Sequence, residues 1–133
     1  MKILDSGHRY WLEMLDIQGD QRHGTEMLTF VKRQGPRYPG NNSYYPGTNC
    51  QEVLRALIDR VKHLNSQVPD EHNEPILRSL REALWLFESR AAQRYGRTLP
   101  PLEEFESIES EPPCPQCAHI CCHGECGNRK ALS

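Results

Sequence analysis

The sequence predicts an α+β fold: a small N-terminal β core packed with a C-terminal antiparallel two-helix hairpin, plus a cysteine-rich tail. Two apolar stripes with helical spacing predict the hairpin, and a short β-prone segment before them predicts the β core. Five of the six cysteines lie in the tail. We expect residues 1–48 to form the β core with its loop and residues 49–97 to form the hairpin. Residues 98–113 are an acidic linker, and residues 114–133 are the tail.

The β core is predicted from one short segment. Residues 25–34 are β-prone and place Leu28 and Phe30 on the same face of a strand. We therefore expect a β layer that includes residues 27–33. Residues 1–24 have a mixed composition that predicts no particular element.

A turn-rich loop follows this segment and contains the triplet Tyr-Pro-Gly twice, at residues 38–40 and 45–47. Proline followed by glycine favours a type II turn, because proline presets the first φ angle and glycine accepts a positive φ at the next position. A polar loop of this length inside a compact domain is typical of functional loops.

The first helix is predicted over residues 50–65. Asn49 and Glu52 fit a capping box at its start, and Thr48 with Gln51 offers an alternative register. Apolar residues recur at the three- and four-residue spacing of an amphipathic helix. They are Val53, Leu54, Leu57, Ile58, Val61 and Leu64.

The second helix is predicted over residues 74–95, with Asn73 as its cap, Pro75 in its first turn and Gly96 at its end. A short polar connection makes the two helices antiparallel. Neither apolar stripe can be covered by the other alone, so we expect a β layer or a second subunit on the exposed side, and hence oligomerisation. The second stripe consists of Ile76, Leu77, Leu80, Leu84, Phe87 and Ala91.

Charge is distributed unevenly along the chain. The 133 residues carry a net charge of −2, but residues 22–47 have an excess of positive charge and residues 98–113 contain glutamates without any cation. The near-neutral average argues against bulk nucleic-acid binding, which needs a basic stripe. A small anionic ligand needs only a few well-placed cations. The proline-bounded acidic linker predicts no fixed structure.

The N-terminus lacks the apolar stretch of a secretory signal, and no apolar run is long enough to span a membrane. We therefore expect a cytoplasmic protein without disulfide bonds.

The spacing of Cys114 and Cys117 is typical of half a zinc site, and structural zinc takes four such donors. Cys121 and His119 are spare donors, and a thiol-rich tail without metal is the alternative. The preferred ligand set is Cys114, Cys117, Cys122 and Cys126.

Three arginines share one edge of the second predicted helix. Arg90, Arg94 and Arg97 follow i, i+4, i+7 spacing beside Phe87. A solvated helix face is the simpler interpretation. The alternative is a phosphate clamp, since arginine side chains bind phosphate in a bidentate manner and aromatic rings stack on bases. The loop offers further candidates in Lys32, Arg33, Arg37, Tyr38, Tyr44 and Tyr45. No nucleophile–base arrangement, P-loop or metalloprotease motif is present in the sequence, so we predict that the protein is not an enzyme.

Three segments read LTFVKRQGPRYPGN, YPGTNCQEVLRALIDRVKHLNSQ and EHNEPILRSLREALWLFESRAAQRYGR. They resemble the first type of Thoeris anti-defence protein of bacteriophages, and the helical hairpin is similar to that of the small CBASS-antagonist sponges of phages. The resemblance covers roughly residues 28–97. It depends on the linked features KR-x-GP-x-YPG, YPGT before the first helix, ALIDR, and RAAQR before the glycine.

The resemblance implies a binding protein that sequesters its ligand without degrading it. Such a sponge binds cyclic ADP-ribose isomers made by bacterial TIR proteins and keeps them from the defence effector in the host cytoplasm. The family pairs a β core with two antiparallel helices, assembles as dimers and hexamers, and holds the ligand between core and helices. Some members also bind cyclic oligonucleotides of CBASS signalling at a separate site.

The resemblance also implies site residues. Arg90 and Arg94 match phosphate clamps, and Asn73 matches a position at the start of the second helix. The resemblance implies a phenyl-type aromatic residue at the position where this chain has His63. The implied ligand-binding set is Arg33, Arg37, Tyr38, His63, Asn73, Arg90 and Arg94. The alternative function is an oligomeric adaptor that uses the hairpin for assembly and a zinc tail to contact protein or nucleic acid.

Overall fold

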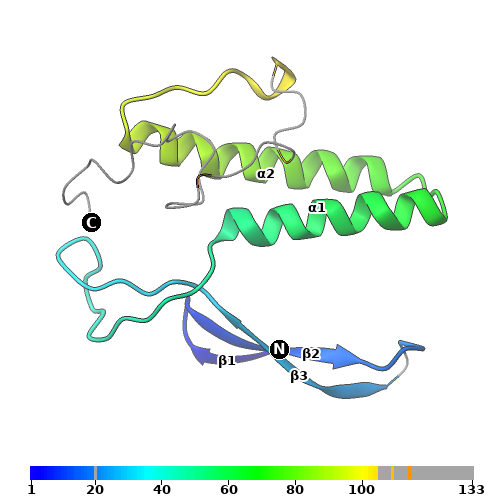
Figure 1. Ribbon diagram of the computed structural model, residues 1–133, viewed down its shortest axis with the longest axis horizontal. Coiled ribbons are helices and arrows are strands. Elements are labelled where there is room, and N and C mark those ends of the chain that lie inside the picture. The colour runs from blue at the N-terminus through cyan, green and yellow to red at the C-terminus, as the bar shows by residue number, and fades with distance from the viewer. Residues whose placement is uncertain (20, 105–108, 110–113, 115–133) are drawn as a thin grey trace. The chain divides into compact units, whose positions relative to one another are not determined.

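The computed structural model describes residues 1–19 and 21–104, together with Glu109 and Cys114. Figure 1 shows strands followed by helices, so the predicted α+β class is confirmed. The chain divides after Asn49 into two compact units, which we call the sheet unit and the hairpin unit. The elements are β1 (Lys2–Asp5), β2 (Arg9–Leu15), β3 (Arg22–Thr29), α1 (Cys50–Gln67), α2 (Asn73–Arg94) and a short 3-10 helix η1 (Leu102–Glu104).

The sheet unit is a three-stranded antiparallel sheet with strand order β1-β2-β3. Two of its strands lie within residues 1–24, where the composition predicted no element. The strand expected around residues 27–33 is displaced, because β3 ends at Thr29. Beyond this point Phe30 and Lys32 form only isolated bridges, to Thr48 and Tyr45. The β-prone residues therefore lead from the sheet into the loop.

Pairing between strands creates two different faces. On one face Trp11 pairs with Met27 and with Lys2, whose ammonium lies 5.4 Å from the Trp11 ring. On the other face Tyr10 pairs with Leu28, and its ring meets Phe30 edge to face with centroids 6.1 Å apart. None of the described residues of the sheet unit is buried. Cross-strand pairs, and not a core of its own, therefore hold this sheet together.

The two Tyr-Pro-Gly triplets have different structures. At Tyr38 the prediction is right: the Asn41 amide donates to the Tyr38 carbonyl at 3.1 Å, and Gly40 has φ 88°. The second triplet runs on without such a turn, because the Thr48 amide donates to the Thr29 carbonyl. Here glycine is needed for space, since a Cβ at Gly47 would lie 2.5 Å from the Phe30 carbonyl carbon.

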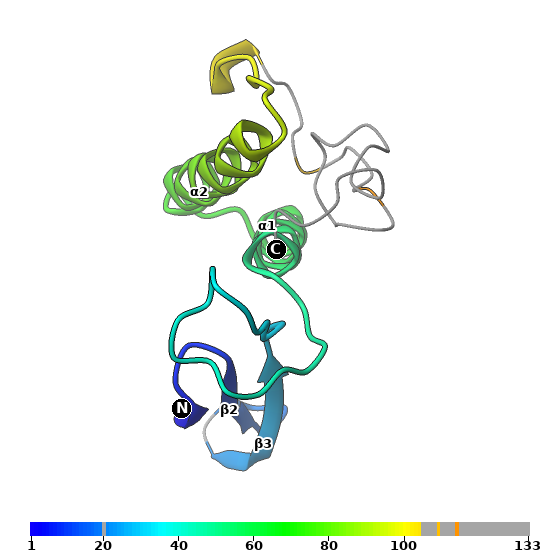
Figure 2. The ribbon, with the colours of Figure 1, turned by 90° about the vertical axis from the view of Figure 1, so that its left-hand side faces the viewer.

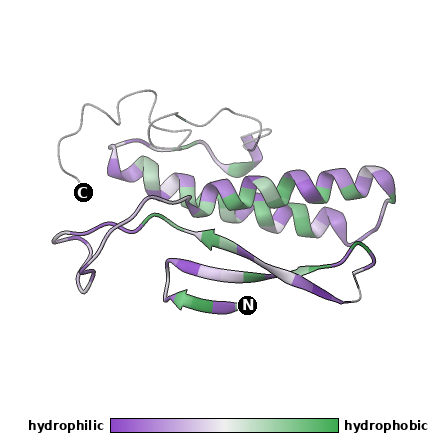
Figure 3. Cartoon of the chain, turned by 60° about the horizontal axis from the view of Figure 1, so that its bottom comes forward, coloured by the Kyte–Doolittle hydropathy of each residue, from purple (hydrophilic) through white to green (hydrophobic). Residues whose placement is uncertain are grey.

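The hairpin unit contains the apolar core of the described chain. Helix α1 extends the predicted helix to Gln67, and α2 begins at Asn73 and ends at Arg94, close to the predicted bounds. Figure 2 looks along the helices and shows them side by side, and Figure 3 shows apolar residues recurring along both. The core consists of buried Ile58, Leu77 and Leu84, with Leu54, Val61, Leu80 and Trp85 packed against them.

Polar contacts fix both ends of α2. His72 occupies the cap position without a side-chain hydrogen bond to the helix backbone, so Asn73 is the first helical residue and not the cap. The side-chain amide of Asn73 donates to Asn65 Oδ1 at 2.9 Å and joins α2 to α1. Gly96 ends the helix as predicted, with φ 66°. The Arg97 amide donates to the Ala92 carbonyl, which is the pattern of a Schellman motif.

The segment after α2 returns along the hairpin. Leu99 packs against Ala91 and Ala92. The Trp85 indole donates to the Pro100 carbonyl at 2.8 Å. Further on, Glu109 accepts hydrogen bonds from Arg81 of α2. The expectation of no fixed structure across the acidic linker is therefore wrong for these residues, since Pro100 and Glu109 accept hydrogen bonds from side chains of α2.

No helix in the described part of the chain is long and apolar enough to cross a membrane.

Candidate functional site

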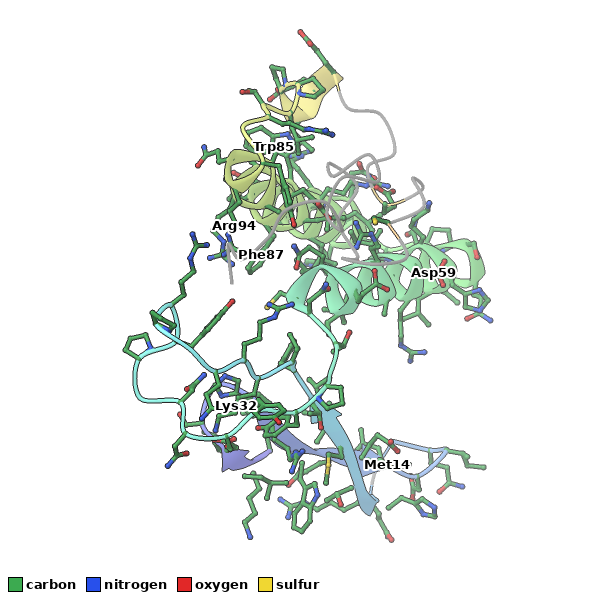
Figure 4. The ribbon with its side chains drawn as sticks, turned by 60° about the vertical axis from the view of Figure 1, so that its left-hand side comes forward. Met14, Lys32, Asp59, Trp85, Phe87 and Arg94 are labelled. Atoms are coloured by element: carbon green, nitrogen blue, oxygen red, sulfur yellow. The ribbon has the colours of Figure 1, made fainter. Side chains whose placement is uncertain are left out.

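The predicted phosphate clamp lies in the last two turns of α2. Arg90 and Arg94 are both exposed and one turn apart. Figure 4 shows Arg94 on the same side of α2 as Phe87, with Trp85 on the other side. That other side is occupied by the returning segment, because Trp85 bonds to Pro100. The described contact of the returning segment at Pro100 therefore lies on the side of α2 away from Arg94.

An aromatic ring orients one of the two arginines. The Arg90 guanidinium carbon lies 5.1 Å from the centroid of the Phe87 ring, a cation–π distance. No carboxylate among the described residues pairs with Arg90. A guanidinium held against a ring keeps its outer N–H donors available, so this edge is suited to binding an anion. Arg97 does not extend the edge, because the helix ends before it.

The loop candidates belong to the sheet unit. Arg33 and Arg37 are exposed, and Tyr38 is half-buried at the turn described above. The Arg33 carbonyl accepts a hydrogen bond from the Asn41 side chain at 2.8 Å, which folds the loop across itself. The predicted grouping of basic and aromatic residues in one loop is present. Its position relative to the α2 arginines stays a prediction, since the two units are separate bodies.

His63 and Asn73 do not join the arginines within one hairpin. Asn73 begins α2, and the rise of a helix puts it about 25 Å from Arg90. His63 is exposed on α1 and turned about 140° around the helix axis from the core residue Ile58. The amide nitrogen of Asn73 is already bonded to Asn65. Within the hairpin, His63 and Asn73 therefore lie at one end, and the two arginines of α2 lie at the other.

A buried ion pair that the sequence analysis missed joins α1 to α2. Glu88 of α2 has a side chain 0% exposed and accepts from Arg55 of α1, itself 11% exposed, at 2.7 Å. Arg55 also contacts Glu52 at 3.0 Å. One signal could have revealed this pair: Glu88 follows Leu77 and Leu84 at core spacing on the apolar stripe. A charge at such a position needs a partner on the facing helix.

A second missed cluster joins the loop to the sheet. Asp5 of β1 accepts hydrogen bonds from Lys32 and Tyr45, which lie at the two ends of the loop. The hydrogen bonds from Lys32 and then Tyr45 hold the pKa of Asp5 below its ordinary value. Burial and the bond to Asp5 raise the pKa of Tyr45. Nothing in the sequence spacing indicates this cluster, because its members are far apart along the chain.

Of the predicted zinc ligands, the structure describes Cys114 alone, and this residue is half-buried. Cys117, Cys122 and Cys126 lie outside the described residues. The described part of the chain holds no cluster of three potential metal ligands. Cys50 is exposed at the first position of α1, so it belongs to the cap region and not to the core.

Comparison with protein-family models and with curated protein sequences gives no match.

Proposed function

We propose that this protein is a phage anti-defence sponge that binds cyclic nucleotide immune signals and sequesters them without degrading them. The ligands are cyclic ADP-ribose isomers, and cyclic oligonucleotides of CBASS signalling are further candidates. The protein acts in the cytoplasm of the infected bacterial host. Its ligand is held by arginine–phosphate pairs, with aromatic rings of the site stacking on the base.

The observation that carries this proposal is the edge of α2 formed by Phe87, Arg90 and Arg94. Both arginines are exposed, and the Phe87 ring supports Arg90. The same edge belongs to the segment whose sequence resembles the phage family, at RAAQR before Gly96. A cyclic nucleotide presents phosphates and a base within one small molecule, which suits paired guanidinium groups beside an aromatic ring.

Self-association is part of the proposal. One hairpin separates Asn73 from Arg90 by about 25 Å, more than a mononucleotide-sized ligand spans. Symmetric assembly of two copies brings the beginning of one α2 toward the end of another, as an isologous contact allows. Dimers, and hexamers built from them, would then complete each site. Exposed apolar residues on both helices, such as Leu57, Leu64 and Ile76, supply surface for such contacts.

The tail is proposed to hold one structural zinc ion through Cys114, Cys117, Cys122 and Cys126. Thiolates are the donors that structural zinc prefers, and the ion would crosslink a segment too short to have its own core. Elemental analysis of protein purified without added metal should give about one zinc per chain. A chain with Cys117→Ser and Cys126→Ser should lose it. A folded, fully reduced wild-type chain without zinc would contradict this assignment.

Recovery of the bound ligand tests the proposed function. Purified protein is mixed with each cyclic ADP-ribose isomer and with cyclic oligonucleotides, separated from free ligand, and heated to release what it holds. A sponge returns the intact cyclic nucleotide in nearly full yield. Release of a linear product would make the protein an enzyme. Failure to retain any of these ligands would favour the adaptor function instead.

A further inference from the structure

The loop that carries Arg33, Arg37 and Tyr38 is closed at its base by one pair of residues. The Lys32 amide donates to the Tyr45 carbonyl at 3.0 Å, and the Tyr45 amide donates to the Lys32 carbonyl at 3.1 Å. These reciprocal bonds are the narrow pair of an antiparallel bridge. Everything between Lys32 and Tyr45 therefore forms a closed loop on a two-residue base.

The side chains of the same two residues meet on one carboxylate. Lys32 Nζ donates to Asp5 Oδ2 at 2.8 Å, and the Tyr45 hydroxyl donates to the same oxygen at 2.5 Å. The Lys32 side chain is 10% exposed, so this contact is largely shielded from water. Asp5 belongs to β1 at the opposite edge of the sheet order from β3. One oxygen atom thus joins both ends of the loop to the sheet.

The side chains of Arg9, the first residue of β2, and of His8 just before it contact the Tyr45 ring. The Arg9 guanidinium carbon lies 4.2 Å from the ring centroid, and His8 meets the ring edge to face at 6.5 Å. Arg9 Nε is buried and has no hydrogen-bond partner among the described residues. Close to Tyr45 in sequence, the backbone of Gly47 lies directly against that of Phe30.

We propose that Asp5 is the positioning residue of the ligand-binding loop: it fixes the loop base through Lys32 and Tyr45 and so sets where Arg33, Arg37 and Tyr38 are presented. Asp5 touches no ligand in this role. A loop tied at both ends loses little further entropy when a ligand orders it, so the contact increases affinity. The role of the loop in binding rests on the proposed function, but the positioning of the loop does not.

Trypsin tests the positioning because Arg33 and Arg37 are its cleavage sites inside the loop. The variants are Asp5→Asn and Tyr45→Phe, which keep shape but remove the carboxylate charge or the hydroxyl. Glu26→Gln is the matched control, an exposed carboxylate of β3 whose cross-strand partner is Leu12 of β2. Cleavage after Arg22, at the start of β3, reports general opening of the sheet unit.

We expect cleavage after Arg33 and Arg37 to become several-fold faster in Asp5→Asn and Tyr45→Phe, with cleavage after Arg22 unchanged. Glu26→Gln should match the wild-type chain at every site. Equal acceleration at Arg22, or none in the loop, would overturn the positioning role. Cyclic ADP-ribose affinity is measured on the same variants and should fall in Asp5→Asn and not in Glu26→Gln. If the wild type binds no nucleotide while loop cleavage responds as expected, the proposed function fails and the positioning role stands.

Discussion

The two units of this chain are held together by different means. The hairpin unit buries Ile58, Leu77 and Leu84 between two helices, and a shielded ion pair joins Glu88 to Arg55. The sheet unit has no buried residue among those described, and it depends on strand pairing and on the contacts of Asp5. Substitutions that remove apolar volume should therefore damage the hairpin unit, whereas loss of single polar contacts should reshape the sheet unit.

The contrast also separates what each unit offers a ligand. The hairpin provides a rigid helix edge on which Arg90 and Arg94 are fixed by helix geometry. The sheet unit provides a loop whose shape depends on a few hydrogen bonds at its base. Functional residues on a loop are best held by a scaffold that pins both ends.

The largest stability effect is expected at Glu88. Replacing it by alanine leaves the Arg55 charge shielded and without its main partner, which should lower the free energy of unfolding by about 3–5 kcal/mol. The control is Glu82→Ala, an exposed carboxylate on the same helix, expected to change stability by about 0.5 kcal/mol or less. Urea unfolding of the full chain measures both. Equal effects of the two substitutions would contradict the buried ion pair.

Core packing should show the next largest difference between the units. Leu84 is 0% exposed, so Leu84→Ala should cost about 2–5 kcal/mol of unfolding free energy. Leu15 of β2 is 59% exposed, and Leu15→Ala should cost about 0.5 kcal/mol or less. Chemical denaturation followed by circular dichroism compares them. A large effect at Leu15 would mean that the sheet face is covered in solution, and the contrast between the units would not hold.

A smaller effect concerns pH. The pKa of Asp5 is lowered by hydrogen bonds from Lys32 and Tyr45 and by the nearby His8 charge, so the folded state favours its ionised form. Its contribution to stability is present above the ordinary carboxylate pKa and is lost as pH falls through the lowered value. Tyr45 has a raised pKa, so its contribution is lost as pH rises through that value.

Nuclear magnetic resonance titration of the Asp5 carboxyl carbon measures this effect. The groups around it are Lys32, Tyr45, His8 and Arg9. In Lys32→Met the titration midpoint of Asp5 should move upward, because the largest cause of the lowered pKa is removed. An unchanged midpoint would show that Lys32 does not hold this carboxylate in solution.

The helices were predictable because their information is local. Apolar spacing located α1 and α2 to within a few residues, and Gly96 marked the end of the hairpin. Strands β1 and β2 were not predictable, since an exposed sheet has no apolar alternation to reveal it. Gly47 shows the same limit: the requirement for glycine comes from Phe30, which is distant in sequence.

The candidate site was predictable to a similar extent. Arg90 and Arg94 share an edge because helix geometry dictates it, and the structure agrees. His63 and Asn73 were grouped with them by resemblance, and a single hairpin does not bring them together. Asp5 could not be found from the sequence, because its partners Lys32 and Tyr45 reach it only through tertiary folding.

Calorimetric titration of a cyclic ADP-ribose isomer into the chain tests the central claim most directly. The comparison is between the wild type, the Arg90→Ala, Arg94→Ala double variant, and Arg78→Ala, an exposed arginine elsewhere on α2. Each lost arginine–phosphate pair is worth about 1.5–3 kcal/mol, so one substitution should weaken binding by about ten- to a hundredfold. The double variant should lose nearly all binding, and lysine at either position should restore only part of it, since an ammonium lacks the bidentate geometry. Arg78→Ala should bind as the wild type does. Unchanged affinity in the double variant, or an equal loss in Arg78→Ala, would contradict the account.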